Sequence, residues 1–556
     1  MNQRLFLLVF LATVFTSAAM PVFAQTPAAK QSGYTLITPD LLRPHLKFLA
    51  SDELEGRETA KRGQKIAARY IATQFERLGL KPFGDSGTYF QKFSVTEQKI
   101  GGGSKFVIAS KPKRGSKVET TVNSSFLEDF YFFPRGFGIT GDSVKGAVVF
   151  LGYGINDLKT YKYSDYSGLD VKGKIVVVMA GEPQAQSKES VFNGDQPTRW
   201  SNWATKRTAA IDAGAAAVLM VNDLGGLPFL PQQVEPLRDV MMSGTMSLVG
   251  SSSAKEIRPE SRVQGTPLIF ISSALANQVL KSTGKTVDAL QKGMEKNGRP
   301  ASFEIAGVSL TIAIDFQKKI LETENVCGLL EGSDEKLKDE LIVYTGHYDH
   351  LGITDSGVIN NGADDDGSGT TAVIALAEAF ARNGERPKRS ILFMTVAGEE
   401  KGLLGSKYYT DHPKWPLEKT VADFNIDMVG RIDPKYDALK NPNYVYVIGS
   451  DKISKELDEL LQKQNKETVN LTLDYTYNDE NDPNRFYYRS DHYNFAKNGI
   501  PIIFFFNGTH ADYHKPTDDV EKINFDKMSL ITRLAFSVGW ETANRANGLK
   551  KNAAQP

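Results

Sequence analysis

The chain has 556 residues with 66 basic and 66 acidic side chains, and 41% of its residues are hydrophobic. This length corresponds to roughly two to four domains, and the hydrophobic share suffices for a sizeable core, which excludes a wholly disordered chain. The formal net charge of zero argues against a broad electrostatic nucleic-acid binder. A single cysteine, Cys327, excludes any disulfide within the chain, and we expect it to be a small buried residue in a strand.

The first residues have the pattern of an export signal. Arg4 precedes an apolar run over 5–15, and small residues lead to Val22-Phe23-Ala24. This order of a positive charge, an apolar stretch and a small-residue cleavage site predicts that residues 1–24 are a signal peptide. The apolar run is short for a membrane span of about 20 residues. We therefore expect an exported protein, periplasmic or extracellular, with no stable membrane anchor after cleavage.

After the signal pattern, the sequence predicts two amphipathic helices and then a region of different composition. Leucines recur at helical spacing over 41–49, and a second helical pattern runs over 64–78 and ends at Gly79. Valine-rich runs at 147–151 and 175–179 then predict buried strands. This middle region indicates an inserted unit with its own core, and a generic α/β insertion is the alternative to any more specific interpretation.

From about residue 305 onward, apolar strand patterns alternate with helical patterns. This alternation predicts an α/β fold with a doubly wound, mostly parallel sheet flanked by helices. The expected strands are 341–345, 391–396, 423–426, 445–448 and 500–506, and the expected helices are 370–381, 453–464 and 525–542.

Histidines and carboxylates follow the ends of these strands, where ligands bind in such sheets. Each signal alone has an ordinary explanation, because aspartates cap helices, a histidine beside a carboxylate is often a hydrogen bond, and paired glutamates are often solvated. Their convergence at one sheet edge predicts a catalytic metal site with nitrogen and oxygen ligands, and the excess of carboxylates favours two metals with a shared carboxylate. The groups are His347 to His350, Asp364 to Asp366, Glu399 and Glu400, Asp427, and Asp512 to His514.

Five motifs in this region resemble those of the co-catalytic zinc peptidases, the family that includes leucyl aminopeptidases, glutamate carboxypeptidases and the transferrin receptor. The middle region resembles a protease-associated (PA) domain through DYSGLDVKGKIVVV and GAAAVLMVND. The resemblance implies a peptidase domain of the zinc exopeptidase type in two parts, 25–124 and 305–556, separated by a β-rich PA-like domain at 125–304. The five motifs, in family order, are TGHYDHLG, NGADDDGSG, AGEEKGLLGS, FNIDMVG and DYHKPTDDV.

The resemblance also implies a role for each site residue. Asp365 would bridge two zinc ions and precede a non-proline cis peptide bond. Asp349 would orient the His347 ring, and Glu399 would be the general base. Tyr487 would contact the oxyanion, with Tyr488 as the alternative. The remaining metal ligands would be His347 and Asp427 on one zinc and Glu400 and His514 on the other.

Several residues near these motifs have a second interpretation. Ser490-Asp491-His492 could suggest a serine triad, but triad members are usually dispersed along a chain, so we place these residues in the pocket wall. His350 could be a spare ligand, although a supporting or helix-capping role is favoured. Asp518 would orient the His514 loop, and His510 is expected at the surface.

The predicted function is hydrolysis of peptide substrates by an exported di-zinc aminopeptidase. A carboxypeptidase and a glutaminyl cyclase on the same fold remain open, as does a catalytically inactive, receptor-like binding protein. Arg431, Arg485 and Arg489 are candidates to hold the substrate carboxylate of a carboxypeptidase. Manganese or cobalt could replace zinc in an oxygen-rich site. Side-chain preference, oligomeric state and the role of the PA-like domain stay open.

Overall fold

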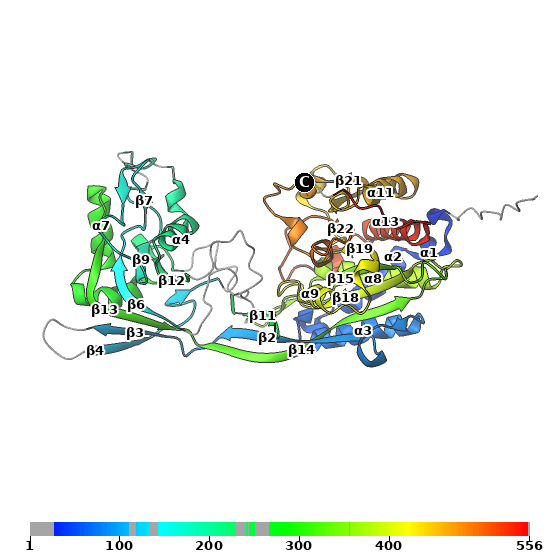
Figure 1. Cartoon of the computed structure of the whole chain (residues 1–556), viewed down its shortest axis with the longest axis horizontal. Coiled ribbons are helices and arrows are strands. Elements are labelled where there is room, and N and C mark those ends of the chain that lie inside the picture. The colour runs from blue at the N-terminus through cyan, green and yellow to red at the C-terminus, as the bar shows by residue number, and fades with distance from the viewer. Residues whose placement is uncertain are drawn as a thin grey trace, which may run out of the picture.

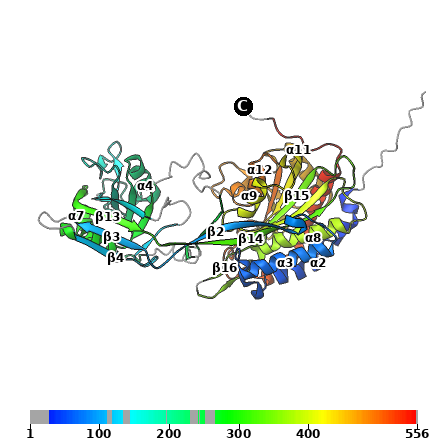
Figure 2. The ribbon, with the colours of Figure 1, turned by 60° about the horizontal axis from the view of Figure 1, so that its bottom comes forward.

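The computed structural model describes residues 27–553 except for 111–117, 134–142, 186, 189, 195, 230–240, 243, 251–265 and 355. The expected signal peptide at 1–24 lies outside the described residues. Two lobes make up the described chain, and the long strands β2 and β14 run between them (Figures 1 and 2). Among the described helices, none is both long enough and apolar enough to cross a membrane.

The larger lobe is built on a ten-stranded mixed sheet. Its four central strands, β18, β15, β19 and β22, are parallel to one another, as the alternation of strands and helices predicts. The flanking strands β14 and β20 are antiparallel to their central neighbours. In spatial order the strands are β11 (Thr245–Leu248), β2 (Phe90–Ile100), β14 (Phe316–Leu330), β18 (Ser390–Val396), β15 (Leu341–His347), β19 (Thr420–Ile426), β22 (Ile502–Phe506), β20 (Tyr444–Ile448) and β21 (Thr472–Asp474), with β1 (Lys81–Pro82) beside β14.

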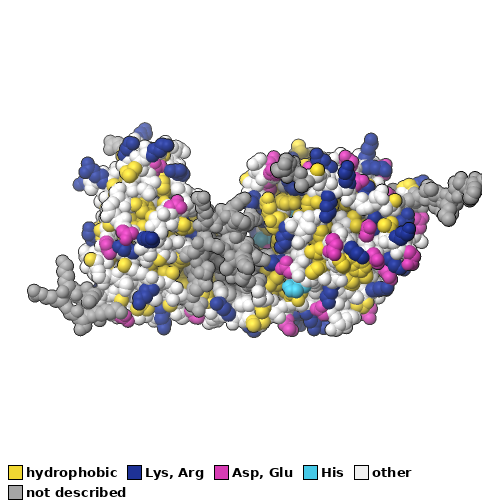
Figure 3. All heavy atoms as spheres, viewed as in Figure 1, with side chains coloured by type: hydrophobic (Ala, Val, Ile, Leu, Met, Phe, Trp, Pro, Cys, Tyr) yellow, Lys and Arg dark blue, Asp and Glu magenta, His cyan; other side chains and the backbone are white. Residues whose placement is uncertain are grey.

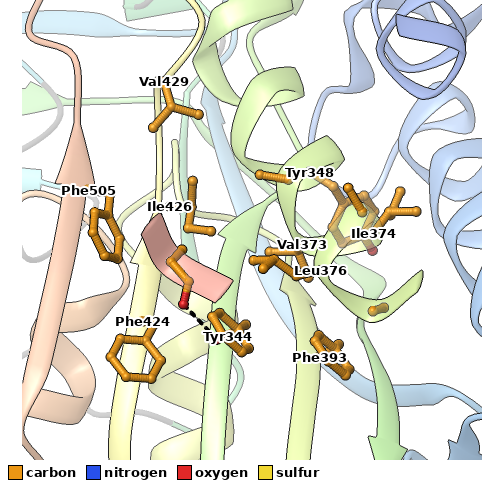
Figure 4. Close-up of a cluster of buried hydrophobic side chains, with 14 of the residues drawn as sticks. Tyr344, Tyr348, Val373, Ile374, Leu376, Phe393, Phe424, Ile426, Val429 and Phe505 are labelled. Atoms are coloured by element: carbon orange, nitrogen blue, oxygen red, sulfur yellow. Dashed lines mark hydrogen bonds between the residues drawn. The ribbon is translucent and has the colours of Figure 1, made fainter. Parts of the chain in front are cut away.

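Helices cover both faces of this sheet because successive strand residues point to opposite faces. Tyr344 and Phe393 pack toward one face, in a cluster with α2, α3, α8, α11 and α13, part of which is drawn in Figure 4. Val343 and Leu392 pack toward the other face with residues of α9 and α12. The helices of this lobe are α1 (Ser32–Leu36), α2 (Pro39–Leu49), α3 (Arg62–Arg77), α8 (Gly369–Ala381), α9 (Leu404–Asp411), α10 (Pro434–Ala438), α11 (Lys455–Glu467), α12 (His492–Ala496) and α13 (Phe525–Asn544).

The smaller lobe has an eight-stranded sheet with its own core. Residues of α6 (Ser273–Leu280) and α7 (Val287–Asn297) pack in the cluster on one face, and Ala210 of α4 (Trp203–Asp212) packs in the other cluster. In spatial order the strands are β4 (Val118–Asn123), β3 (Lys105–Ser110), β13 (Phe303–Ala313), β6 (Ser143–Phe150), β9 (Ile175–Met179), β10 (Ala217–Val221), β12 (Leu268–Ile271) and β5 (Phe130–Tyr131).

This second sheet extends past the expected domain boundaries. β3 and β4 precede residue 125, and β13 continues past residue 304. The reason is that β13 pairs with both β3 and β6, so the first and last strands of the inserted region lie side by side in the sheet. The remaining short pairs are β7 (Asn156–Asp157) with β8 (Tyr163–Ser164) and β16 (Gly352–Ile353) with β17 (Ile359–Asn360).

Candidate metal centre

The predicted ligands come together at one edge of the large sheet. β15, β18, β19 and β22 are parallel, so their carboxyl ends meet there. A single π-helical turn, Ala363–Ser368, lies between β17 and α8 and carries the three aspartates. The residues that follow or end these elements are His347 on β15, Glu399 and Glu400 after β18, Asp427 after β19, His514 after β22 and Asp365 in the π-helical turn.

The first candidate metal group consists of His347, Asp365 and Asp427. The Nε2 atom of His347 lies 3.2 Å from Oδ1 of Asp365 and 3.7 Å from Oδ1 of Asp427. All three side chains are buried, so each charge has little solvent to stabilise it. A cation between these atoms would compensate the two carboxylates.

The second candidate metal group consists of His350, Asp365 and Glu400, and His514 lies beside it. The Nε2 atom of His514 is 3.0 Å from Oδ2 of Asp365 and 3.3 Å from Oε2 of Glu400. The two groups therefore share Asp365, which presents Oδ1 to one and Oδ2 to the other. This is the arrangement expected of a carboxylate that bridges two metals.

The donor atoms fit zinc. In the described part of the chain, Nε2 of His350 is buried without a hydrogen-bond partner, and Oδ2 of Asp365 and Nδ1 of His350 make no well-formed hydrogen bond and face other ionisable side chains of the site; a metal ion would relieve this costly state. The donors are imidazole nitrogens and carboxylate oxygens, and Cys327 lies buried in β14, as expected. Such a set without thiolates is typical of catalytic zinc sites.

Asp366 holds the loops around the bridging residue in place. Its Oδ1 accepts hydrogen bonds from the backbone N–H groups of Gly369 and Met428, and its Oδ2 accepts from that of His347. The expected cis peptide bond between Asp365 and Asp366 is present. One carboxylate thus connects the π-helical turn, β15 and the segment after β19.

Asp349 contacts the His347 ring through its backbone, and not through its carboxylate as the expected role would require. The backbone carbonyl oxygen of Asp349, 3.0 Å away, is the hydrogen-bond partner of His347 Nδ1, while the Asp349 carboxylate is 3.8 Å from that nitrogen. The carboxylate instead accepts hydrogen bonds from the Thr59 hydroxyl at 2.6 Å and the Glu399 backbone N–H at 3.2 Å. Asp349 therefore orients both the His347 ring and the Glu399 backbone, since a carbonyl serves as well as a carboxylate for the ring.

Glu399 lies at the edge of the first metal group. Its Oε2 is 3.9 Å from Nε2 of His347. Burial raises the pKa of Glu399 well above its usual range; His347 opposes this shift, and the like charges of Glu400 and Asp427 add to it. A carboxylate with a raised pKa beside a catalytic centre is suited to accept and return a proton.

A cavity opens over the first metal group, and Tyr513 is the tyrosine that lines it. Tyr487, the residue expected at the oxyanion, is not among the lining residues. The short helical turn Phe486–Tyr488 directs Phe486 into the cavity, while Tyr487 packs on the rings of His492 and Tyr493. The lining residues are His347, Asp365, Glu399, Asp427, Met428, Phe486, Arg489, Ser490, Phe504, Phe506, Thr509, Tyr513 and His514.

Ser490 lies in the cavity wall, as expected, and does not form a triad with its neighbours. Its hydroxyl donates to Oδ2 of Asp427 at 2.6 Å and accepts from the Asn425 amide at 2.9 Å. The partner of His492 is instead the Tyr487 carbonyl oxygen, 2.8 Å from Nε2. Ser490 thus orients a metal ligand.

Two residues in and just before the last motif lie differently from the expectation. His510, expected at the surface, is buried, and its Nε2 is 3.2 Å from Oδ2 of Asp364 because its loop folds over the aspartates. Asp518 accepts hydrogen bonds from the backbone N–H groups of Asp364 and Asp365. It therefore holds the bridging residue directly.

Comparison with known proteins agrees with this geometry. Residues 325–538, which carry every predicted metal ligand, match the model of Peptidase family M28. This segment is thus similar to peptidase family M28.

Curated relatives of this segment include proteins named as aminopeptidases, zinc metalloproteases and a leupeptin-inactivating enzyme. Aminopeptidase YwaD of Bacillus subtilis is 25% identical over 232 residues, which cover 40% of this chain and 45% of the relative. Leupeptin-inactivating enzyme 1 of Streptomyces exfoliatus is 32% identical over 175 residues, 31% of this chain and 34% of the relative. The aligned segments thus span less than half the length of these curated relatives.

A solved structure extends the similarity to the fold of nearly the whole chain. The aminopeptidase from Aneurinibacillus sp. strain AM-1 superposes with a TM-score of 0.52 at 18% identity, covering 94% of this chain and 98% of that one. At this identity the likeness concerns the fold alone. It includes the smaller lobe, which the M28 match leaves out.

Arg57 is a residue of the site that motif reasoning missed, and it lies outside the M28 match. It is fully buried, and its guanidinium donates to the carbonyl oxygens of Leu49, Tyr348, Asn361 and Gly362. Burial lowers its pKa, and the nearby carboxylates oppose that shift. Arg57 thus supplies a permanent cation behind an acidic site. Its position within the stretch LASDELEGRET, residues 49–59, is the one sequence feature that could have indicated this.

Proposed function

We propose that the chain is a di-zinc aminopeptidase that hydrolyses the first peptide bond of its substrates. The observation that carries the proposal is the Asp365 carboxylate, whose two oxygens face two separate candidate metal groups. The M28 match and the names of the relatives support a peptidase.

Each group of residues would have a separate role in peptide hydrolysis. Zinc ions held by these groups would polarise the scissile carbonyl and make water acidic enough to attack near neutral pH. Glu399 would take the proton from the attacking water and pass it to the leaving amine. The Tyr513 hydroxyl, in the cavity wall and within 3.3 Å of an Arg489 nitrogen, would donate a hydrogen bond to the developing oxyanion.

The cavity walls favour an apolar first side chain in the substrate. Met428, Phe486, Phe504 and Phe506 line the space beside the first metal group. These side chains cannot hydrogen-bond a polar substrate group, so they would bind a leucine- or phenylalanine-like side chain best.

The position of Arg489 supports a second candidate function, which is carboxypeptidase activity. Of the three arginines considered, it is the one that lines the cavity. Arg431 is paired with Asp512 at 2.6 Å, and the Arg485 guanidinium lies over the Tyr488 ring. A guanidinium at the cavity could hold a substrate carboxylate in bidentate fashion.

A panel of blocked dipeptides tests the proposal. Each dipeptide carries an apolar first residue and is blocked either at the amino or at the carboxyl end, and zinc per chain is counted by elemental analysis. We expect about two zinc ions per chain and cleavage of the carboxyl-blocked dipeptides only. Cleavage restricted to the amino-blocked dipeptides would establish the carboxypeptidase instead. One zinc with cyclisation of amino-terminal glutamine would establish a glutaminyl cyclase, and no zinc with no turnover would establish a binding protein.

We also propose that the smaller lobe is a PA-like domain and that the protein is exported. The lobe's separate sheet and core support the first statement. The charge and apolar pattern of residues 1–24 supports the second. Processing at Ala24 can be checked by amino-terminal sequencing of protein recovered outside the cytoplasm.

A further inference from the structure

His350 is the buried side chain of the site that has no role in the mechanism above. It follows β15 by three residues, and the ring is fully buried. Neither ring nitrogen makes a well-formed hydrogen bond among the described residues, and Nε2 faces no charged partner, while Nδ1 lies close to the Glu400 carboxylate. Burial removes the hydration of the imidazole and these contacts replace it only in part, so its position needs a physical reason.

The ring of His350 points at the second metal group. Its Nδ1 lies 2.8 Å from Oε1 of Glu400 and 3.8 Å from Oδ2 of Asp365. The His514 ring approaches the same two carboxylates through Nε2, and the two imidazole centroids are 5.9 Å apart with planes inclined at 66°. Two imidazole nitrogens and two carboxylates thus surround one small volume.

The surrounding backbone holds the His350 ring in this position. A side chain at Gly362 would place its Cβ 2.4 Å from Cδ2 of His350, so the ring packs directly on the glycine backbone. The backbone N–H of His350 donates to the Arg57 carbonyl oxygen at 3.1 Å. These contacts restrict the orientation of the ring, which lowers the entropic cost of binding a metal at this place.

We propose that His350 is a direct ligand of the second zinc ion, which makes the two halves of the centre unequal. This inference rests on the proposed di-zinc function. The second half then has four protein ligands: His350, Asp365, Glu400 and His514. The first half has three: His347, Asp365 and Asp427. Four protein ligands are typical of closed, tightly held zinc, and three leave an open position for chemistry. The first half, over which the cavity opens, is therefore the half that receives substrate.

Metal titration of the full-length protein tests this asymmetry. Zinc is removed, returned in steps against a competing chelator, and followed by elemental analysis; cobalt loading gives a visible absorption spectrum for each half. In the wild-type protein we expect a tight first equivalent and a weaker second one. His350→Ala should weaken the tight equivalent by more than about 100-fold, the upper range for residues that only orient a ligand, and should change the first cobalt spectrum.

Three further variants complete the test. His350→Gln preserves side-chain volume and should lose the tight equivalent too, which guards against a folding defect in the alanine variant. His510→Ala removes another buried imidazole that faces Asp364, outside both metal groups, and should leave both affinities unchanged. His347→Ala should weaken the second equivalent and spare the first.

The outcomes separate this inference from the proposed function. If the wild-type protein binds two zinc ions and His350→Ala weakens neither by more than about 100-fold, His350 only positions Glu400 and the inference is wrong. If the wild-type protein binds no zinc, the proposed function itself fails.

Discussion

At the scale of single residues, neighbours of the same residue type have different roles in the site. Glu399 and Glu400 are adjacent in sequence, yet Glu400 faces Asp365 and His514 while Glu399 borders the open cavity. Successive residues after a strand point in different directions, so adjacent glutamates can take separate roles.

Glu399→Gln should lower turnover by about 10²–10⁴-fold, the usual contribution of a general base, because an amide cannot accept the proton. Zinc content should not change, since Glu399 belongs to neither metal group. Steady-state kinetics with a carboxyl-blocked dipeptide, together with elemental analysis, measure both quantities. Glu97→Gln, at a carboxylate paired with Lys61 away from the site, is the control. Full activity of Glu399→Gln would remove this residue from the mechanism.

Tyr513→Phe should lower kcat by up to about 10²-fold with a small change in KM, because a donor to the oxyanion acts mainly in the transition state. Tyr487→Phe should keep wild-type kcat, since Tyr487 packs on His492 outside the cavity. Parallel kinetics of the two variants decide between these tyrosines. The reverse result would assign the role to Tyr487.

Lys206 in the smaller lobe should make stability depend on pH. Burial lowers its pKa from 10.5 to about 7, although its Nζ donates to the carbonyl oxygens of Tyr153, Met179 and Gly181. Between these two pKa values the unfolded chain binds more protons, so stability should rise as pH increases from 7 to 9. Urea unfolding at several pH values, monitored through the buried Trp200, measures this change in stability. Lys206→Met should flatten the rise, and exposed Lys159→Met should not.

At the scale of elements, α13 packs so closely on β15 that it requires a glycine. A Cβ at Gly539 would lie 1.6 Å from the Tyr344 hydroxyl oxygen. That hydroxyl donates to the Ala535 carbonyl oxygen at 2.9 Å and cannot easily move away (Figure 4). Helix propensity alone would favour alanine at position 539 by about 1 kcal/mol, so packing overrides local preference here.

Gly539→Ala should therefore lower the free energy of unfolding by about 1–3 kcal/mol through overpacking. Tyr344→Phe removes the clashing oxygen and alone should cost about 1 kcal/mol for the lost hydrogen bond. The double variant should be less destabilised than the sum of the two single variants, because the substitutions share one contact. Urea denaturation of the four proteins completes the cycle. If the two changes in the free energy of unfolding were strictly additive, the clash would be relieved by movement elsewhere in the structure.

At the scale of the whole molecule, the two lobes have separate cores and are connected through paired strands. Ile100 and Phe316 are direct partners in the β2–β14 ladder, and β11, which lies between them in sequence, also returns to the larger sheet to pair with β2. On the face drawn in Figure 3, basic and acidic side chains are interspersed over the described surface of both lobes.

Replacing residues 101–315 by Asn-Gly should leave a folded larger lobe that keeps its zinc, because a two-residue turn can join antiparallel partners. The deletion removes β11, which pairs only at the edge with β2, so some stability should be lost. Circular dichroism, cooperative unfolding and zinc counting test this. A shortened chain without cooperative unfolding would show that the larger lobe depends on the insertion.

The sequence alone predicted the central strands of the larger sheet, its longer helices and the residues able to bind metal, but not long strands such as β2 and β13. The apolar runs that predicted these strands are buried because they form the core, and histidines and carboxylates that follow parallel strands meet at one edge of the sheet. Which of the nearby side chains face the centre follows only from the folded arrangement. Arg57, His350 and Tyr513 lie in irregular segments, where direction depends on packing against residues far away in sequence. Arg57, for example, contacts the Gly362 carbonyl oxygen 305 positions along the chain, and no local pattern encodes such a contact.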